Sequence, residues 1–153
     1  MYNWMGKNFS VKILYSKASI ATGIIIKLND TGKYILIDCG DGTLRDLLEA
    51  GIETDKISAI FLSHEHYDHI GGIYSLFGYF RFKKRTDDIQ IYYPANCRTI
   101  KKIFTILFEN YKKDSFSINL NPVNIGNVLI HDNIKEAKEL GKFAKDYIFI
   151  HKK

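Results

Sequence analysis

The chain has 153 residues, of which 46% are hydrophobic and 14% aromatic, and this is enough to bury the core of one ordinary domain. Lysine and arginine outnumber aspartate and glutamate by 22 to 17, so the net charge is +5. The sequence shows no low-complexity tract, internal repeat, secretory signal or apolar run long enough to cross a membrane. We therefore expect a single domain over residues 1–153, and repeat proteins and membrane-spanning proteins are excluded.

The first third of the chain predicts strands followed by a helix. Three apolar, β-branched runs predict strands over 9–15, 20–28 and 34–37. The loop 16–19 between the first two could face a functional site, and a turn at 29–33 joins the second to the third. Thr43 is expected to cap a helix that reaches Ala50, with Gly51 ending it.

The middle of the chain alternates between strands and helices. Residues 57–63 predict a buried strand, residues 70–82 a helix, and residues 89–93 a short strand stopped by Pro94. The next helix carries an apolar stripe that we interpret as core: Ile100, Ile103, Phe104, Leu107, Phe108 and Tyr111. Further strands are expected over 116–120 and 123–130, then a helix over 133–144 and a final strand that ends at residue 151.

The most informative segment is His64-Glu65-His66-Tyr67-Asp68-His69, which directly follows the buried strand. It holds three of the five histidines of the chain and an aspartate between the last two. Imidazole nitrogens and carboxylate oxygens are ligands that zinc takes. A helix would send His64 and His66 to roughly opposite faces, so we expect the site in a strand-to-helix loop. One metal could take His64 and His66 and a second Asp68 and His69, whereas a polar turn without metal is the alternative.

The neighbouring residues Glu65 and Tyr67 are expected to pack against the site or support it rather than bind metal. Cys39 and Cys97 lie far apart in the sequence, and without a secretory signal we expect free thiols in a reducing, cytoplasmic compartment.

Two sequence blocks carry a family resemblance. The block from Leu62 to Gly72 resembles the His-x-His-x-Asp-His signature of the metallo-β-lactamase fold. The block from Tyr34 to Thr43 resembles the strand and glycine-rich turn that precede this signature, and its wording is closest to the ribonuclease Z-like branch. The resemblance covers residues 10 to 110. It implies an α/β (α+β) protein, an αββα metallo-β-lactamase-like sandwich in which two sheets pack face to face between helices.

The resemblance also implies a set of site residues. The implied metal ligands are His64 and His66 for the first ion and Asp68, His69 and His151 for the second. The metal would be zinc, with two ions if the site is complete. Asp38 would hold a ligand imidazole in place from outside the site, although an aspartate in a strand-end turn is its alternative interpretation.

Two ligands that the family normally uses have no match in the chain. They are a third histidine for the first metal and an aspartate that bridges the two metals. The stretch 110–127 where they should lie offers Asp114, and His131 and Asp132 are further candidates. We therefore expect an intact N-terminal half, a shortened C-terminal half with a reduced second sheet, and a retained final strand.

Basic residues are concentrated in two groups beyond the histidine motif. The first group closes the helix predicted after the motif and the second opens the next helix: Arg81, Lys83, Lys84 and Arg85, then Arg98, Lys101 and Lys102. A basic rim beside a hydrolytic site would attract a polyanion. Cations that complement a helix dipole are the alternative explanation for the first group.

The resemblance implies a metal-dependent hydrolase of phosphodiesters, RNA among them. The metal would lower the pKa of a water molecule, and Asp68, as the catalytic residue, would orient that nucleophile or take its proton. The alternative is a non-catalytic or impaired relative with an incomplete metal site, which would act as a binding subunit. A third interpretation completes the site with another chain, and an exposed flank of the sheet would favour a homo-oligomer.

Overall fold

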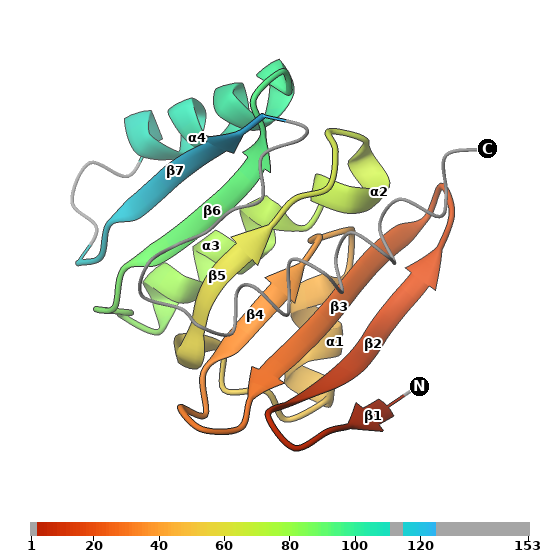
Figure 1. Cartoon of the computed structure of the whole chain (residues 1–153). Coiled ribbons are helices and arrows are strands. Elements are labelled where there is room, and N and C mark those ends of the chain that lie inside the picture. Colours follow the sequence, from red (N-terminus) through yellow and green to blue (C-terminus); the bar gives the residue numbers. More distant parts are fainter. Residues whose placement is uncertain (1–2, 111–114, 125–153) are drawn as a thin grey trace.

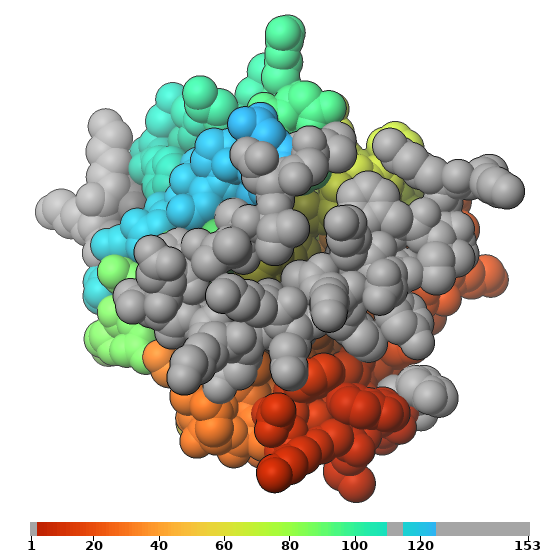
Figure 2. All heavy atoms as spheres, in the orientation of Figure 1, coloured from red at the N-terminus to blue at the C-terminus, as the bar shows by residue number. Residues whose placement is uncertain are grey.

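The computed structural model describes residues 3–110 and 115–124, and its centre is one seven-stranded sheet. The strands follow one another in chain order across the sheet: β1 (Asn3–Met5), β2 (Phe9–Lys17), β3 (Ala21–Leu28), β4 (Tyr34–Ile37), β5 (Ile57–Phe61), β6 (Ile89–Pro94) and β7 (Ile118–Val123). Strands β1 to β4 pair antiparallel, and β4 to β7 pair parallel. The N-terminal strands and β7 therefore lie at opposite ends of the molecule (Figure 2).

Helices connect the parallel strands and cover one face of the sheet (Figure 1). They are α1 (Thr43–Glu49), α2 (Tyr67–Ile70), α3 (Ile73–Phe82) and α4 (Arg98–Asn110), with a short 3₁₀ turn η1 (Thr54–Lys56) before β5. The large rings of Phe77, Phe80 and Phe104 are fully buried between these helices and the sheet. No helix in the described ranges is long and apolar enough to span a membrane.

Alternating side chains give the sheet two apolar faces. In β4, Leu36 joins the cluster under the helices, whereas Ile35 and Ile37 join a second cluster on the opposite face. In β5, Ile60 and Ala59 divide between the two clusters in the same way. This period of two is what a sheet buried on both faces requires.

The predicted class, a mixed α/β protein, is confirmed. Three expectations fall outside the described residues: the reduced second sheet of the expected sandwich, the strand over 123–130 beyond Val123, and the final helix and strand. Strand expectations over 9–15, 20–28, 34–37, 57–63 and 89–93 match β2 to β6 within a few residues. Within the described chain, the carboxyl ends of the parallel strands lie along the same edge of the sheet. The histidine motif follows β5 at that edge.

Two helix expectations were wrong. Residues 70–82 do not form one helix, because the chain breaks at Gly71-Gly72 into α2 and α3. Gly72 packs so closely against the backbone of Gly40 that a Cβ would overlap the carbonyl oxygen of Gly40. Thr43 does not cap α1 either: the capping position is Gly42, with φ 75°, and Thr43 is the first helical residue.

Candidate metal centre

The histidine motif lies in a loop between β5 and α2. His66 is still extended, with φ −73° and ψ 148°, and the helix begins at Tyr67. His64 therefore lies in the loop before the helix, while Asp68 and His69 occupy the first turn of α2. The motif is thus placed in a strand-to-helix loop.

Three side chains of the motif converge. His64, Asp68 and His69 each offer a ligand atom, and these atoms lie within 4.8 Å of one another. The Nε2 atom of His69 is 3.5 Å from Oδ2 of Asp68. His69 reaches the same point as His64 because the chain changes from extended to helical between them. A strand continued through the motif would have turned His69 to the other side.

His66 lies beside this group without joining it. Its ring meets the ring of His64 edge-on, with centroids 4.6 Å apart and planes at 73°. The side chain of His66 is exposed, so it lies on the solvent side of the group. The remaining candidate ligands, His151, His131, Asp132 and Asp114, all lie outside the described residues.

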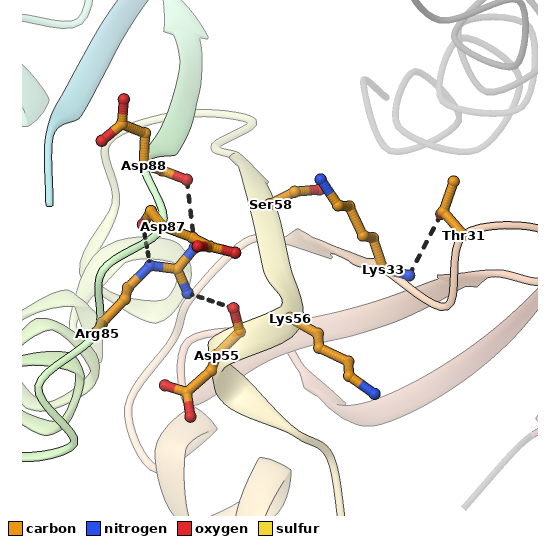
Figure 3. Close-up of a pocket in the computed structure, with 8 residues that line it drawn as sticks. All are labelled: Thr31, Lys33, Asp55, Lys56, Ser58, Arg85, Asp87 and Asp88. Atoms are coloured by element: carbon orange, nitrogen blue, oxygen red, sulfur yellow. Dashed lines mark hydrogen bonds between the residues drawn. The ribbon is translucent and has the colours of Figure 1, made fainter.

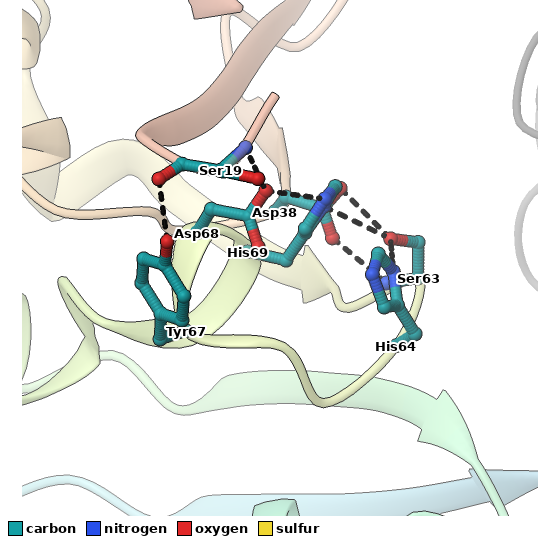
Figure 4. Close-up of polar contacts among 7 residues, drawn as sticks. All are labelled: Ser19, Asp38, Ser63, His64, Tyr67, Asp68 and His69. Atoms are coloured by element: carbon teal, nitrogen blue, oxygen red, sulfur yellow. Dashed lines mark hydrogen bonds and ion pairs between the residues drawn. The ribbon is translucent and has the colours of Figure 1, made fainter. Parts of the chain in front are cut away.

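Asp38 connects two of the histidines (Figure 4). Its Oδ2 atom is 2.7 Å from Nδ1 of His69 and accepts a hydrogen bond of 2.9 Å from the hydroxyl of Ser63. That hydroxyl lies 3.0 Å from Nδ1 of His64. The other oxygen, Oδ1, accepts the backbone N–H of Ser63 at 2.8 Å. Asp38 is buried, so a single carboxylate organises the inner side of the site.

Chain topology explains why Asp38 and Ser63 meet. Asp38 follows β4, Ser63 follows the neighbouring parallel strand β5, and Ile37 is paired with Phe61. Parallel strands present their carboxyl ends at one edge of a sheet, which is where sites form in such folds. Asp38 adopts φ 56°, a left-handed conformation that aspartate tolerates better than most residues. This turn aims its carboxylate back toward the end of β5.

The turn between β2 and β3 supports the site from the other side. The backbone N–H of Ser19 donates to Oδ2 of Asp68 at 2.9 Å. The hydroxyl of Tyr67 donates to the carbonyl of Ser19 at 2.6 Å, as Figure 4 shows. Ser19 itself adopts a left-handed conformation in this turn, with φ 63°. The loop 16–19 thus faces the site, and Tyr67 supports it, as expected from the sequence.

Burial, hydrogen bonds and neighbouring charges shift the pKa values of His64, Asp68 and His69, and not all in the same direction. Burial lowers the pKa of His64, and the nearby His69 and His66 lower it further. For His69, burial acts in the same direction, but the hydrogen bond and charge of Asp38 outweigh it and raise the pKa. Burial acts to raise the pKa of Asp68, yet the Ser19 N–H and the charge of His69 leave it lowered. Asp68 is therefore held as a carboxylate and His64 as a neutral imidazole.

Glu65 links the motif to α4. Its Oε2 atom accepts the backbone N–H of Thr99 at 2.8 Å, in the first turn of α4. A carboxylate at this position satisfies a free amide and complements the helix dipole. The exposed cations Arg98, Lys101 and Lys102 lie on this same end of α4, so the second basic group is next to the motif.

The first basic group is not part of a rim around the site. Arg85 is 3% exposed and lies where β5 and β6 begin, at the opposite edge of the sheet (Figure 3). Its guanidinium donates to five backbone carbonyls, those of Thr54, Asp55, Ile57, Asp87 and Asp88. Arg81, Lys83 and Lys84 lie at the same far end, because α3 runs away from the motif. Of the two interpretations of this group, the basic rim beside the site is therefore wrong.

The residues present fit a zinc-type metal. Two imidazoles and one carboxylate are within reach of a common point. Hydrogen bonding at Nδ1 of His64 and His69 leaves Nε2 of each ring as the metal-binding nitrogen. Sequence reasoning assigned no role to Ser63, although a hydroxyl directly before the first histidine, at the end of a buried strand, was the signal that could have revealed it.

Curated proteins named ribonuclease Z resemble this chain in sequence. The chain is 34% identical over 101 residues to ribonuclease Z of Methanosarcina acetivorans, covering 65% of this chain and 33% of that protein. It is 38% identical over 94 residues to ribonuclease Z of Methanococcus aeolicus, covering 61% and 28%. The chain spans about a third of the length of the curated relatives it matches.

Solved structures show the same fold. The short form of human tRNase Z superposes with a TM-score of 0.64 at 22% identity, over 73% of this chain and 44% of that one. A diphosphatase from the PhnP family superposes with a TM-score of 0.58 at 18% identity, over 80% and 53%. Residues 13–110, well over half of the chain, match the family described as anti-Pycsar protein Apyc1. The chain resembles ribonuclease Z in sequence, has the metallo-β-lactamase fold and belongs to the anti-Pycsar protein Apyc1 family.

Proposed function

We propose that this protein is a metal-dependent hydrolase of phosphodiesters, with RNA as a candidate substrate. The observation that carries the proposal is the convergence of His64, Asp68 and His69 at the carboxyl edge of the parallel strands. Relatives named ribonuclease Z and a structural neighbour named a diphosphatase support phosphate esters as the substrate class.

The metal would be zinc, bound by His64, Asp68 and His69. His66 and His151 are proposed as further ligands, which would allow a second ion. When bound, zinc would lower the pKa of a water molecule and polarise a phosphoryl oxygen. The lowered pKa of His64 suits this role, because a metal binds the neutral imidazole.

Asp68 would orient the attacking water. Its Oδ2 atom is fixed by the Ser19 N–H, so the carboxylate has a defined direction. Its lowered pKa makes it a ready hydrogen-bond acceptor and a weak base at neutral pH. We therefore favour orientation of the nucleophile over proton abstraction as the contribution of Asp68. Arg98, Lys101 and Lys102 on the adjacent end of α4 would attract the negatively charged substrate.

The test is turnover of bis(p-nitrophenyl) phosphate by the 153-residue chain supplied with zinc. We expect turnover in the wild-type protein and a loss of at least about 100-fold in Asp68→Ala, in the range seen when an essential catalytic group is removed. Asp41→Ala, which replaces an exposed aspartate in the turn after β4, is the matched control and should retain full turnover.

Equal turnover in the wild type and in Asp68→Ala would reject the mechanism. Tight zinc binding without any turnover of phosphodiesters would instead support the alternative, an impaired relative that acts as a binding subunit.

A further inference from the structure

Ser63 places one hydroxyl between a carboxylate and two imidazoles. Its Oγ atom is 2.9 Å from Oδ2 of Asp38, 3.0 Å from Nδ1 of His64 and 3.3 Å from Nδ1 of His69. Its backbone N–H is bound independently to Oδ1 of Asp38 at 2.8 Å. The backbone and the hydroxyl of Ser63 thus make separate contacts with the same carboxylate.

The hydrogens in this cluster can be assigned by elimination. A carboxylate accepts hydrogen bonds and a serine hydroxyl has one hydrogen to donate. If that hydrogen pointed to His64, two oxygen atoms of Ser63 and Asp38 would face each other at 2.9 Å with no hydrogen between them. The hydroxyl therefore donates to Asp38, and its lone pair accepts from Nδ1–H of His64.

This assignment sets the tautomer of His64. With its hydrogen on Nδ1, the ring keeps the lone pair of Nε2 for a metal. The tautomer of His69 is set directly by Asp38, because Nδ1 of His69 is 2.7 Å from Oδ2 of Asp38. Asp38 thus acts on His69 by direct contact and on His64 through Ser63.

We propose that Ser63 is a positioning residue whose hydroxyl fixes the Nδ1–H tautomer of His64 and so presents Nε2 of that ring to the metal. The proposal rests on the proposed function in naming a metal as the partner of Nε2. The tautomer itself is a property of the metal-free protein and can be measured without any metal.

The decisive variants are Ser63→Ala and Ser63→Thr. Alanine removes the hydroxyl and keeps the backbone N–H that binds Asp38, so the fold at the strand end is retained. Threonine restores a hydroxyl at the same position. Ser58→Ala is the matched control: Ser58 is a partly buried serine at the other end of β5, and its hydroxyl donates to the carbonyl of Tyr34 at 3.3 Å.

Two readouts separate positioning from a merely structural role. Long-range ¹H–¹⁵N spectra of the metal-free protein, taken at alkaline pH where imidazoles are neutral, report which nitrogen of His64 carries the hydrogen. Competition with a chelator reports zinc affinity. We expect Ser63→Ala to lose the Nδ1–H signature of His64 and to bind zinc about 10–100-fold more weakly, the range for partners that orient a metal ligand. Ser63→Thr should restore both, and Ser58→Ala should change neither.

The proposal is overturned if Ser63→Ala keeps the wild-type tautomer of His64, or if it keeps wild-type zinc affinity. Failure of the wild-type protein to bind zinc would reject the proposed function instead, and the metal-free spectra would still decide the role of Ser63.

Discussion

Asp38 is the residue on which the geometry of the site depends. It is buried, adopts a left-handed backbone conformation and accepts hydrogen bonds from the backbone and the hydroxyl of Ser63. Its contact with Nδ1 of His69 raises the pKa of that histidine. Carboxylates that orient metal-binding imidazoles in this way tune the metal affinity without touching the metal.

Replacing Asp38 by asparagine tests this role with little effect on the backbone, because asparagine also tolerates φ near 56°. One carboxylate oxygen becomes an NH₂ group, which cannot accept hydrogen bonds from its neighbours. We expect zinc affinity to fall about 10–100-fold and stability to fall by about 1–3 kcal/mol. Chelator competition and urea unfolding measure the two effects. Asp41→Asn, exposed in the same turn, should match the wild type; a wild-type affinity in Asp38→Asn would contradict the assignment.

Arg85 has an equally specific role at the opposite edge of the sheet. Its five guanidinium hydrogens match five backbone carbonyls in η1, at the start of β5 and in the loop before β6. The ring of Phe80 lies 4.8 Å from the guanidinium carbon. A long basic residue in a sequence is ordinarily read as a surface charge, so this burial was not predictable from composition.

Substitution of Arg85 by methionine should destabilise the fold by at least about 3 kcal/mol, because several buried carbonyls lose their donors together. Lysine should not rescue it, since an ammonium cannot reproduce the planar fork. Lys83→Met, at an exposed position at the end of α3, is the control and should change stability by less than about 0.5 kcal/mol. Equal urea midpoints for Arg85→Met and the control would exclude this role.

At the level of elements, the site depends on how α2 packs against the turn after β4. The N–H of Cys39 donates to the carbonyl of His69 at 2.7 Å, and the N–H of Gly72 donates to the carbonyl of Cys39 at 2.8 Å. At Gly40 a Cβ would overlap the backbone of Asp68 and of Thr22. The position of Asp68 therefore depends on a backbone contact that admits no side chain.

We expect Gly40→Ala to displace α2, to destabilise the protein by roughly 1–3 kcal/mol and to weaken zinc binding. Gly78→Ala provides the opposite case, because a Cβ at Gly78 in α3 meets no atom within 4 Å. That variant should gain about 0.5–1 kcal/mol from helix propensity. Thermal unfolding and zinc titration of both variants test these expectations. A Gly40→Ala protein as stable as the wild type would show that the backbone of Asp68 and Thr22 can move to admit a Cβ.

The strands could be predicted because their signal is local. Alternating or continuous apolar residues bounded by turn residues define β2 to β6, and the motif follows the strand that the pattern indicates. The break at Gly71-Gly72 could not be predicted, because it depends on the approach of Gly40 from a distant turn. The convergence of His69 with His64 depends on that same local geometry, and strand periodicity alone turns His69 away.

In the molecule as a whole, the two edges of the sheet carry different groups of residues. The carboxyl edge of the parallel strands holds the motif, Asp38 and the basic end of α4. The opposite edge holds Arg85 within its ring of carbonyls. The interpretation of both basic groups as a rim beside the site fails for the first group, because linear proximity to a motif carries no information about the direction in which a helix runs. A homo-oligomer stays a prediction that light scattering would test.

The proposed function requires that the 153-residue chain binds zinc at His64, Asp68 and His69 and uses it in catalysis. Elemental analysis of the protein purified without chelators tests it most directly, when turnover of bis(p-nitrophenyl) phosphate is measured on the same sample. We expect zinc bound to the wild-type chain, with two ions if His66 and His151 complete the site, and turnover that a chelator abolishes and zinc restores. A chain that carries no zinc and takes up none on titration would contradict it.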